Sequence, residues 1–280
     1  RSPMKINDLF SVEGKVVIVT GGSRGIGEMI ASGFLASGAR VYISSRTANV
    51  CDATAERLRT EHGGQCVSIP ADLSTLEGID GFVAEFSSRE DRLDVLVNNA
   101  GMAAGGPLED FPEESWDRVM ESNVKGPFFM TQRLLPYLEA AASDNSPTKV
   151  INIGSVDGVK VSPFPSVSSY GPSKAAVHQM TRMLAAHLNQ RNVLVNAIAP
   201  GPFPTVMLSR GFGGGGDVEN TDWDKARELN PRERVGLPEE IAGLAIMLGS
   251  RASDYIVGEV ITCDGGYVSA GARFDLRQSG

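Results

Sequence analysis

The stretch "VVIVTGGSRGIGEMI", Val16 to Ile30, decides the fold of this chain. A β-branched run, a glycine-rich turn and the start of a helix follow one another without a gap. Gly21, Gly25 and Gly27 allow the backbone to turn tightly and to approach a pyrophosphate, whose charge a helix N-terminus favours. The stretch therefore predicts a dinucleotide-binding turn, with a merely structural turn as the alternative.

Outward from this stretch, short β-branched runs alternate with longer helical patterns. After "KVVIVT" at 15–20 the runs are "RVYISS" at 40–45, "QCVSIP" at 65–70, "DVLVNN" at 94–99, "KVINIG" at 149–154, "NVLVNAIAP" at 192–200 and "EVITCDG" at 259–265. Apolar strands separated by helix-length segments indicate βαβ units and a parallel sheet covered on both faces. We predict an α/β fold: a Rossmann-like, doubly wound, parallel seven-stranded sheet with helices on both faces, forming a single domain over residues 9–270.

Three helices can be placed from pattern and capping. One runs over 25–37 and ends at Gly38, a plausible C′ glycine. A second covers 113–142, where Gly126 and Pro127 should bend it or distort its hydrogen bonding. The third, over 169–189, begins in "SSYGPSKAAVHQM". With Ser168 or Ser169 as the N-cap, its proline falls in the first turn, where it costs no helical bond.

The segment 202–238 lacks a regular pattern and contains the glycine run 211–216. Because ordering a glycine run costs conformational entropy, we expect a mobile substrate lid or a disordered surface excursion rather than a packed element. Residues 268–280 form a tail, which either reaches a neighbouring subunit or is disordered. Residues 1–3 resemble a cloning remnant and are left out of the fold prediction.

Composition narrows the class of function. The 280 residues are 41% apolar with a formal net charge of -8 and no cluster of Lys or Arg, which argues against nucleic acid and acidic membranes as partners. Cys51, Cys66 and Cys263 show neither metal-ligand nor disulfide spacing, so we expect packing roles and no metal. No apolar run approaches the roughly 20 residues of a membrane helix and no signal peptide opens the chain, so we expect a cytoplasmic protein with a small-molecule substrate.

Further motifs lie in order along the chain: "TGGSRGIG" at 20–27, Asp72 in "ADL", "NNAG" at 98–101, Asn123 in "ESNVKG", Ser155, the pair Tyr170 and Lys174, and "PG" at 200–201. With these motifs, and with three residues between its first two turn glycines, the chain resembles the short-chain dehydrogenase/reductase family from about Leu9 to Tyr267. The resemblance implies an enzyme, a nicotinamide-dependent oxidoreductase that acts on CH-OH and C=O groups. It also implies a homo-oligomer, a tetramer or a dimer, formed through the long helices 113–142 and 169–189.

The end of the second strand selects the cofactor. An acidic residue there accepts the ribose hydroxyls of NAD, and a basic residue accommodates the phosphate of NADP. The chain has Ser45 and Arg46 at this point, with Arg24 in the glycine turn, so we predict NADP(H) rather than NAD(H). The alternative is a solvated Arg46 and relaxed specificity. By resemblance, the cofactor-binding residues are Gly21, Ser23, Arg24, Gly25, Ile26, Gly27, Ser45, Arg46, Asp72, Leu73, Asn99, Ala100, Gly101, Tyr170, Lys174, Pro200, Gly201 and Thr205, with Asn98 supporting the adenosine pocket.

The resemblance also assigns the catalytic residues Asn123, Ser155, Tyr170 and Lys174. Tyr170 would protonate the carbonyl oxygen and Ser155 would hydrogen-bond it. A phenol with an ordinary pKa of about 10 needs help at neutral pH, which a nearby ammonium and an oxidised nicotinamide provide. Asn123 would hold a water that links Lys174 to solvent. The three histidines lie outside every motif, and we expect them to be structural or exposed: His62, His178 and His187.

Candidate substrate residues are largely apolar, which favours a lipophilic ketone. By family position they are Met102, Val156, Val159, Phe164, Phe203, Met207, Leu208 and Phe212, and the alternative is that several only pack loops together. Within the family, "INIGSV", "YGPSKAAVHQM" and "IAPGPFP" most resemble the NADPH-dependent β-ketoacyl reductases of rhamnolipid biosynthesis. Two other functions stay open: a sugar-acid or polyol dehydrogenase, and a catalytically silent NADP-binding sensor or scaffold.

Overall fold

The sheet of the protein contains all seven predicted strands. The computed structural model describes residues 5–161 and 167–270. Its seven-stranded sheet has the order β3-β2-β1-β4-β6-β8-β9, and every neighbouring pair is parallel. The strands are β1 (Val16–Thr20), β2 (Arg40–Ser44), β3 (Cys66–Ser68), β4 (Val95–Asn98), β6 (Thr148–Ile153), β8 (Val193–Pro200) and β9 (Val260–Cys263). The predicted fold is confirmed.

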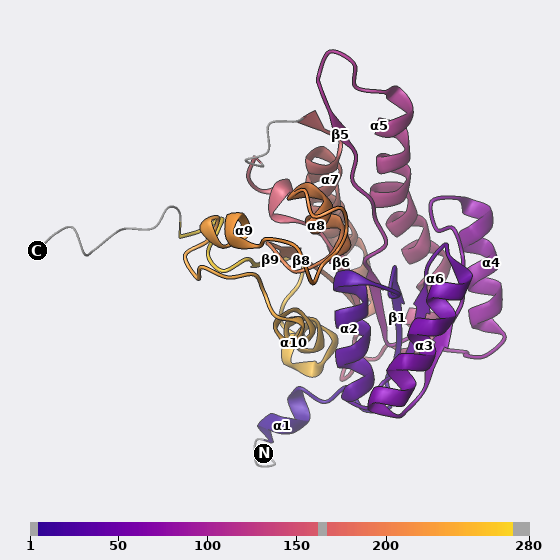
Figure 1. The fold of residues 1–280 in the computed structure, drawn as a ribbon. Helices are drawn as coiled ribbons and strands as arrows, with labels where there is room; N and C mark the ends of the chain where they lie inside the picture. Colours follow the sequence, from indigo (N-terminus) through magenta and orange to yellow (C-terminus); the bar gives the residue numbers. More distant parts are fainter. Residues whose placement is uncertain (1–4, 162–166, 271–280) are drawn as a thin grey trace, which may run out of the picture.

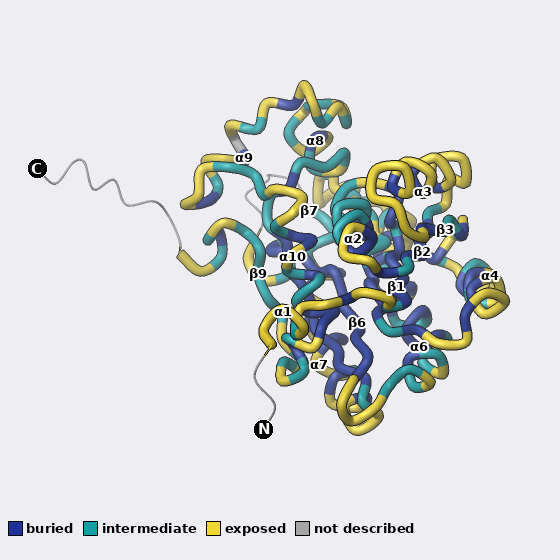
Figure 2. Tube along the Cα trace, turned by 90° about the horizontal axis from the view of Figure 1, so that it is seen from below, coloured by how far each residue is buried: buried dark blue, intermediate teal, exposed yellow. Residues whose placement is uncertain are grey.

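Helices cover both faces of this sheet. The α-helices of the described residues are α1 (Ile6–Leu9), α2 (Gly25–Ala36), α3 (Ala48–His62), α4 (Leu76–Ser87), α5 (Glu113–Met120), α6 (Gly126–Ala141), α7 (Tyr170–Leu188), α8 (Val206–Gly211), α9 (Asp224–Glu228) and α10 (Pro238–Gly249). One hydrophobic cluster lies under α2, α3 and α10, and a second lies under α4, α6 and α7. Figure 1 draws α2 and α3 in front of the strands and α7 behind them, and Figure 2 shows the central strands buried beneath exposed outer helix faces.

Two of the predicted helix ends have clear local causes. Helix α2 ends at Ala36, and Gly38 follows with φ +83, as expected for a C′ glycine. Helix α7 begins at Tyr170 with Ser169 as N-cap, but the Ser169 hydroxyl makes no capping bond. The Ser168 hydroxyl instead accepts a hydrogen bond from the Tyr170 N–H at 3.0 Å. Pro172 therefore lies in the first turn, and Tyr170 and Lys174 share one helix face.

The predicted distortion near Gly126 is a π-helical segment. Residues Glu121–Lys125, η1, separate α5 from α6, so that the backbone hydrogen bonds there span one residue more than in an α-helix. Gly126 follows at a point where a Cβ would lie 2.6 Å from the Leu73 carbonyl oxygen. The close approach of these two backbone segments explains the glycine.

The segment 202–238, expected to be a mobile substrate lid or a disordered surface excursion, contains two short helices, and its role as a lid stays a prediction. The helices are α8 and α9, which Figure 2 places away from the strands of the sheet. The Ser209 hydroxyl, fully buried, accepts from the Gly216 N–H and bonds to Thr221 at 2.6 Å. Positive φ angles at Gly213, Gly215 and Gly216 let the chain fold around this hydroxyl.

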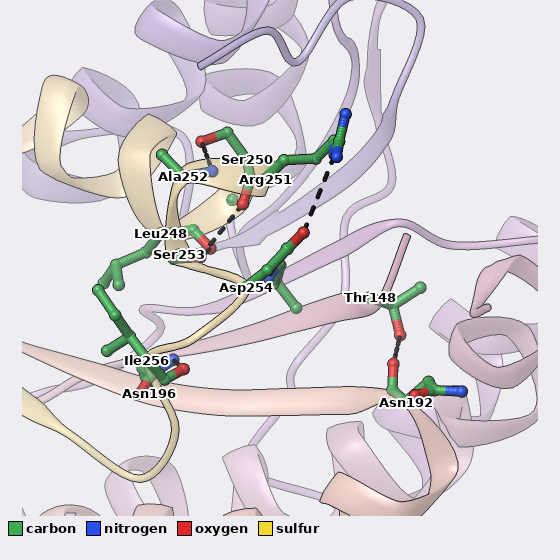
Figure 3. Close-up of polar contacts among 12 residues, drawn as sticks. Thr148, Asn192, Asn196, Leu248, Ser250, Arg251, Ala252, Ser253, Asp254 and Ile256 are labelled. Carbon is green, nitrogen blue, oxygen red and sulfur yellow. Dashed lines mark hydrogen bonds and ion pairs between the residues drawn. The ribbon is translucent and has the colours of Figure 1, made fainter. Parts of the chain in front are cut away.

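A polar network closes the amino ends of β6 and β8 (Figure 3). Lys149 of β6 is 1% exposed, and its Nζ donates to Asp254 Oδ1 at 2.7 Å. Arg251 lies 3.9 Å from the other carboxylate oxygen. The Ser253 hydroxyl donates to the Leu248 carbonyl at 2.7 Å and so fixes the 3₁₀ turn η4 (Arg251–Ser253) that carries these groups. This end of the sheet is a structural support, opposite the candidate site.

Candidate active site

The predicted site residues meet at the carboxyl edge of the sheet. The strand order reverses between β1 and β4, which creates the crevice where ligands bind in doubly wound sheets. The glycine turn follows β1, "NAG" at 99–101 follows β4, Ser155 follows β6 after one glycine, and Gly201 follows β8. Parallel pairing therefore places motifs that are far apart in sequence at one edge.

Glycine is required in the turn after β1. Gly21 and Gly25 have φ +64 and +57, and a Cβ on Gly27 would lie 2.3 Å from Asn99 Nδ2 and from the Gly21 carbonyl oxygen. Asn99 in turn donates from Nδ2 to the Thr20 carbonyl at 2.9 Å and to the Gly21 carbonyl at 3.2 Å. Asn99 thus supports the turn, and the glycines leave the backbone without side chains where a pyrophosphate would approach.

The end of β2 and the glycine turn next to it carry two arginines and no acidic residue. The Gly22 N–H donates to the Ser44 carbonyl at 3.2 Å, which places the glycine turn against the end of β2. Arg24 and Arg46 are exposed, and among the described residues neither has an ion-pair partner. Ser45 is half-buried. Two unpaired guanidinium groups fit a cofactor that carries a ribose phosphate.

The adenine end and the lid side also hold predicted residues. Asp72 Oδ1 accepts from the N–H and the hydroxyl of Ser74, at 3.1 and 2.7 Å, and Leu73 is buried next to it. Thr205 caps α8 by accepting from the Leu208 N–H, and its methyl carbon lies 3.3 Å from where a Gly25 Cβ would be. Helix α8 therefore begins against the glycine turn.

Ser155, Tyr170 and Lys174 form one cluster. The Ser155 hydroxyl accepts from the Asp157 N–H at 3.1 Å and lies close enough to the Tyr170 phenol to oppose the rise in its pKa. Lys174, one turn deeper in α7, lies with Nζ 5.5 Å from the centre of the Tyr170 ring and donates to the Ile153 carbonyl at 2.8 Å.

Burial controls the titration of both α7 groups. It raises the pKa of Tyr170 to about 12, with a further rise from Asp157 and against the lowering effect of Ser155, so the expected lowering by Lys174 is not what the protein alone shows. Burial also lowers the pKa of Lys174 to about 8. At neutral pH the phenol is therefore protonated and the ammonium is charged, the states that an acid and its electrostatic partner need.

Asn123 is fixed by three hydrogen bonds. From η1, its Nδ2 donates to the Met102 carbonyl and to the Ser173 hydroxyl, both at 2.9 Å, and its Oδ1 accepts from the Met102 N–H at 2.8 Å. The amide thus ties the strand-end segment after β4 to α7. Ser173, between Tyr170 and Lys174, is a contact that the sequence analysis missed.

The predicted substrate residues are dispersed. Val156 is buried beside Ser155, and Met207 is exposed on α8. Phe203 is 3% exposed, belongs to the core cluster and lines a cavity of about 240 Å³ with Arg232 and Arg234 rather than with the catalytic cluster. Phe164 lies outside the described residues. Substrate contact by any of them stays a prediction.

Two polar supports of the site were not predicted from the sequence. The Thr20 hydroxyl accepts from the N–H groups of Asn99 and Ala100, both at 2.9 Å. His178 lies behind Ser155, on the α7 face that carries Tyr170. Spacing could have revealed the latter, because positions four residues apart lie on one helix face. Over 5–161 and 167–270 no group of three His, Cys, Asp or Glu side chains could hold a metal, and no helix is long and apolar enough to cross a membrane.

Comparison with known proteins gives consistent matches. The model of the family described as enoyl-(acyl carrier protein) reductase matches residues 21–268. The rhamnolipids biosynthesis 3-oxoacyl-(acyl-carrier-protein) reductase of Pseudomonas aeruginosa is 46% identical over 92% of this chain and 98% of its own length. The 5-keto-D-gluconate 5-reductase of Escherichia coli is 34% identical over 95% of this chain and all of its own.

A solved structure supports the same relationship. The RhlG/NADP active-site complex of Pseudomonas aeruginosa superposes with a TM-score of 0.86 at 44% identity, covering 93% of this chain and 99% of the other. The L-sorbose reductase of Gluconobacter frateurii, solved with NADPH and L-sorbose, has a TM-score of 0.83 at 29% identity, over 94% of this chain and 99% of the other. Reductases of acyl and of sugar ketones therefore share this architecture.

Proposed function

Because the chain belongs to the short-chain dehydrogenase/reductase family, we propose that it is an NADPH-dependent reductase that converts a 3-oxoacyl thioester, or a similar hydrophobic ketone, into its secondary alcohol. One observation carries this proposal: Ser155, which lowers the pKa of the neighbouring Tyr170 phenol, and the buried Lys174 ammonium, 5.5 Å from the Tyr170 ring centre, form one cluster. These groups lie at the carboxyl edge of the sheet, at the crevice that the glycine turn borders.

The bound cofactor would supply the hydride. Arg24, Arg46 and Ser45 would hold the ribose phosphate, and the backbone of the glycine turn would hold the pyrophosphate. Lys174 donates one of its three N–H groups to the Ile153 carbonyl, and the other two are available for the nicotinamide ribose hydroxyls.

Tyr170 would donate its proton to the carbonyl oxygen as hydride arrives at the carbon. The Ser155 hydroxyl would hydrogen-bond the same oxygen and stabilise the charge that develops on it. The Lys174 ammonium would then favour the phenolate that remains. Since the side chain of Asn123 is engaged with protein groups, the water that reprotonates this relay would bind its backbone carbonyl.

Three further parts of the proposal concern the rest of the chain. We propose that residues 202–238, with α8 starting against the glycine turn, act as a lid over the substrate. We propose a homotetramer or dimer formed through α5, α6 and α7, which sedimentation would test, a purely monomeric species being the contrary result. We also propose a cytoplasmic location, which fractionation of cells would test.

The substrate class is tested with a panel of ketones. Purified protein would be assayed with 3-oxoacyl thioesters of increasing chain length, 5-ketogluconate and L-sorbose, each with NADPH and with NADH. The proposal expects the highest kcat/KM with NADPH and a thioester. Turnover of sugars alone would assign the protein to the sugar-acid and polyol reductases.

Tyr170→Phe separates an enzyme from a silent sensor. The variant should bind NADPH as the parent does and lose turnover, because it removes only the hydroxyl that donates the proton. Turnover that survives in Tyr170→Phe would contradict the mechanism, and absence of turnover in the parent with every ketone would support the sensor alternative.

A further inference from the structure

His178 lies two turns below Tyr170 on the face of α7 that carries the catalytic pair. Tyr170, Lys174 and His178 follow each other at intervals of four residues, so one helix stripe presents all three side chains. The histidine is only 4% exposed. A buried imidazole requires hydrogen-bond partners, and those it has belong to the turn that carries Ser155.

The ring bridges the two ends of that turn. The Ser155 N–H donates to His178 Nε2, with 3.4 Å between the nitrogens. The Gly158 backbone also hydrogen-bonds to the ring. Because the Gly158 N–H already donates to the Ser155 carbonyl at 3.0 Å and Nε2 already accepts from Ser155, the ring partner is assigned by elimination as the Gly158 carbonyl, with Nδ1–H as its donor. With this assignment the neutral imidazole accepts at one end of η2 (Val156–Gly158) and donates at the other.

Two glycines make room for the ring. A Cβ on Gly154 would lie 2.1 Å from His178 Nε2, and a Cβ on Gly158 would lie 2.8 Å from Cε1. A side chain at Gly154 would displace the imidazole, whereas a Cβ on Gly158 would also meet the α7 backbone, 2.7 Å from the Lys174 carbonyl carbon. The backbone just before Ser155 is therefore packed directly against this ring, and the segment after it is packed against both the ring and α7.

We propose that His178 is a positioning residue, which holds the Ser155 turn at the height where the serine hydroxyl meets both the Tyr170 phenol and the substrate carbonyl. The inference rests on the proposed function, since Ser155 acts on the carbonyl there. It adds a residue that does not itself touch the substrate.

The surroundings keep this ring neutral. Burial, followed by the positive charges of Lys174 and Arg182, lowers the pKa of His178 to about 4, against the raising effect of the Gly158 bond. Above pH 5 the ring therefore remains an acceptor for the Ser155 N–H. It also adds no charge next to Lys174, so the lysine remains the cation that serves the tyrosine.

A double-mutant cycle tests the positioning role. His178→Leu should lower kcat about 10- to 100-fold, the scale on which small displacements of a catalytic group act, with the dissociation constant of NADPH unchanged. In a Ser155→Ala background, His178→Leu should lower kcat by less than about 2-fold more, because the group it positions is absent. Losses that multiply in the double variant would overturn the proposal.

Two amides separate a specific bond from simple packing. In His178→Gln the side-chain oxygen can reach the place of Nε2 and accept from the Ser155 N–H, so most of kcat should return. His178→Asn reaches only the place of Nδ1 and should stay impaired. Equal activity of the two would contradict the inference. His187→Leu, an exposed histidine on the same helix, is the matched control and should leave kcat unchanged.

A measurement without substrate distinguishes this inference from the proposed function. Imidazole ¹⁵N chemical shifts of the full chain should show His178 protonated at Nδ1 and bare at Nε2. An Nε2-protonated ring would overturn the inference even if His178→Leu failed to fold. If 3-oxoacyl thioesters are not reduced, the proposed substrate fails, and the cycle is run with whichever ketone the parent reduces.

Discussion

Replacing Lys174 by Met should abolish turnover and stabilise the protein at neutral pH. Lys174 is 5% exposed, and burial lowers its pKa from 10.5 to about 8. Below the native pKa, Lys174 is charged in both the native and the unfolded state. Its charge then has a higher free energy in the native state, so it lowers the free energy of unfolding. At about 1.36 kcal/mol for each tenfold change in proton affinity, this lowering is roughly 3 kcal/mol.

Against this gain stands one lost hydrogen bond. Lys174 Nζ is 2.8 Å from the Ile153 carbonyl oxygen, and removing the donor costs about 1–3 kcal/mol. Met keeps most of the apolar stem, so packing changes little. The net increase in the free energy of unfolding at pH 7 should be about 0–2 kcal/mol, even though the catalytic ammonium is gone.

The pH dependence is the sharper signature, because the lost hydrogen bond contributes equally at every pH. As pH rises through 8 the native state releases the Lys174 proton, whereas the unfolded state keeps it to about 10.5. The unfolded state then binds more protons, so wild-type stability rises relative to the variant. The advantage of Lys174→Met should thus shrink by roughly 2 kcal/mol or more between pH 7 and pH 10.

Urea unfolding of both proteins at the two pH values measures this. Lys125→Met, at an exposed position of η1, is the control and should show no such change with pH. The reasoning is refuted if the stability difference between Lys174→Met and the parent is the same at pH 7 and pH 10. It is also refuted if the variant retains turnover.

Three other substitutions test separate parts of the structure. Gly27→Ala should lower the free energy of unfolding by about 1–3 kcal/mol and weaken NADPH binding, because its Cβ would overlap Asn99. Thermal unfolding measures the stability and cofactor titration measures the binding. Unchanged binding would contradict the role of the turn. Arg46→Ala should raise the KM for NADPH about 10-fold or more while sparing that for NADH; equal effects on both cofactors would argue against the phosphate assignment. Asp254→Ala should destabilise the protein by about 3–5 kcal/mol by leaving Lys149 buried and unpaired, without changing kcat. Adding Lys149→Met to this variant should recover stability in urea unfolding. If stability does not recover, the lost ion pair is not the cause of the destabilisation.

Local patterns were sufficient to predict the sheet. Strands buried on both faces read as continuous β-branched runs, and the glycine turn follows the first of them, so the parallel order and the site edge could be predicted. The segment 202–238 was harder, because its order depends on the buried Ser209 hydroxyl. Sequence shows a glycine run there and does not show which side chain the glycines fold around.

The same limit explains why His178 was missed and why the site is built as it is. Spacing places His178 on the α7 face of Tyr170, but its contact with Gly154 and Gly158, about 20 residues away, follows no spacing rule. The stripe of α7 nonetheless has a physical logic. Tyr170 needs a cation beside it, and a second buried cation would add a further desolvation cost. The third polar residue of the stripe is therefore one whose pKa of about 4 keeps it neutral. A lysine or arginine at position 178 would bring a second buried charge next to Lys174 and would leave the Ser155 N–H without an acceptor. The neutral imidazole adds no charge next to Lys174 and accepts from the Ser155 N–H. For this reason we assign to His178 the positioning of Ser155.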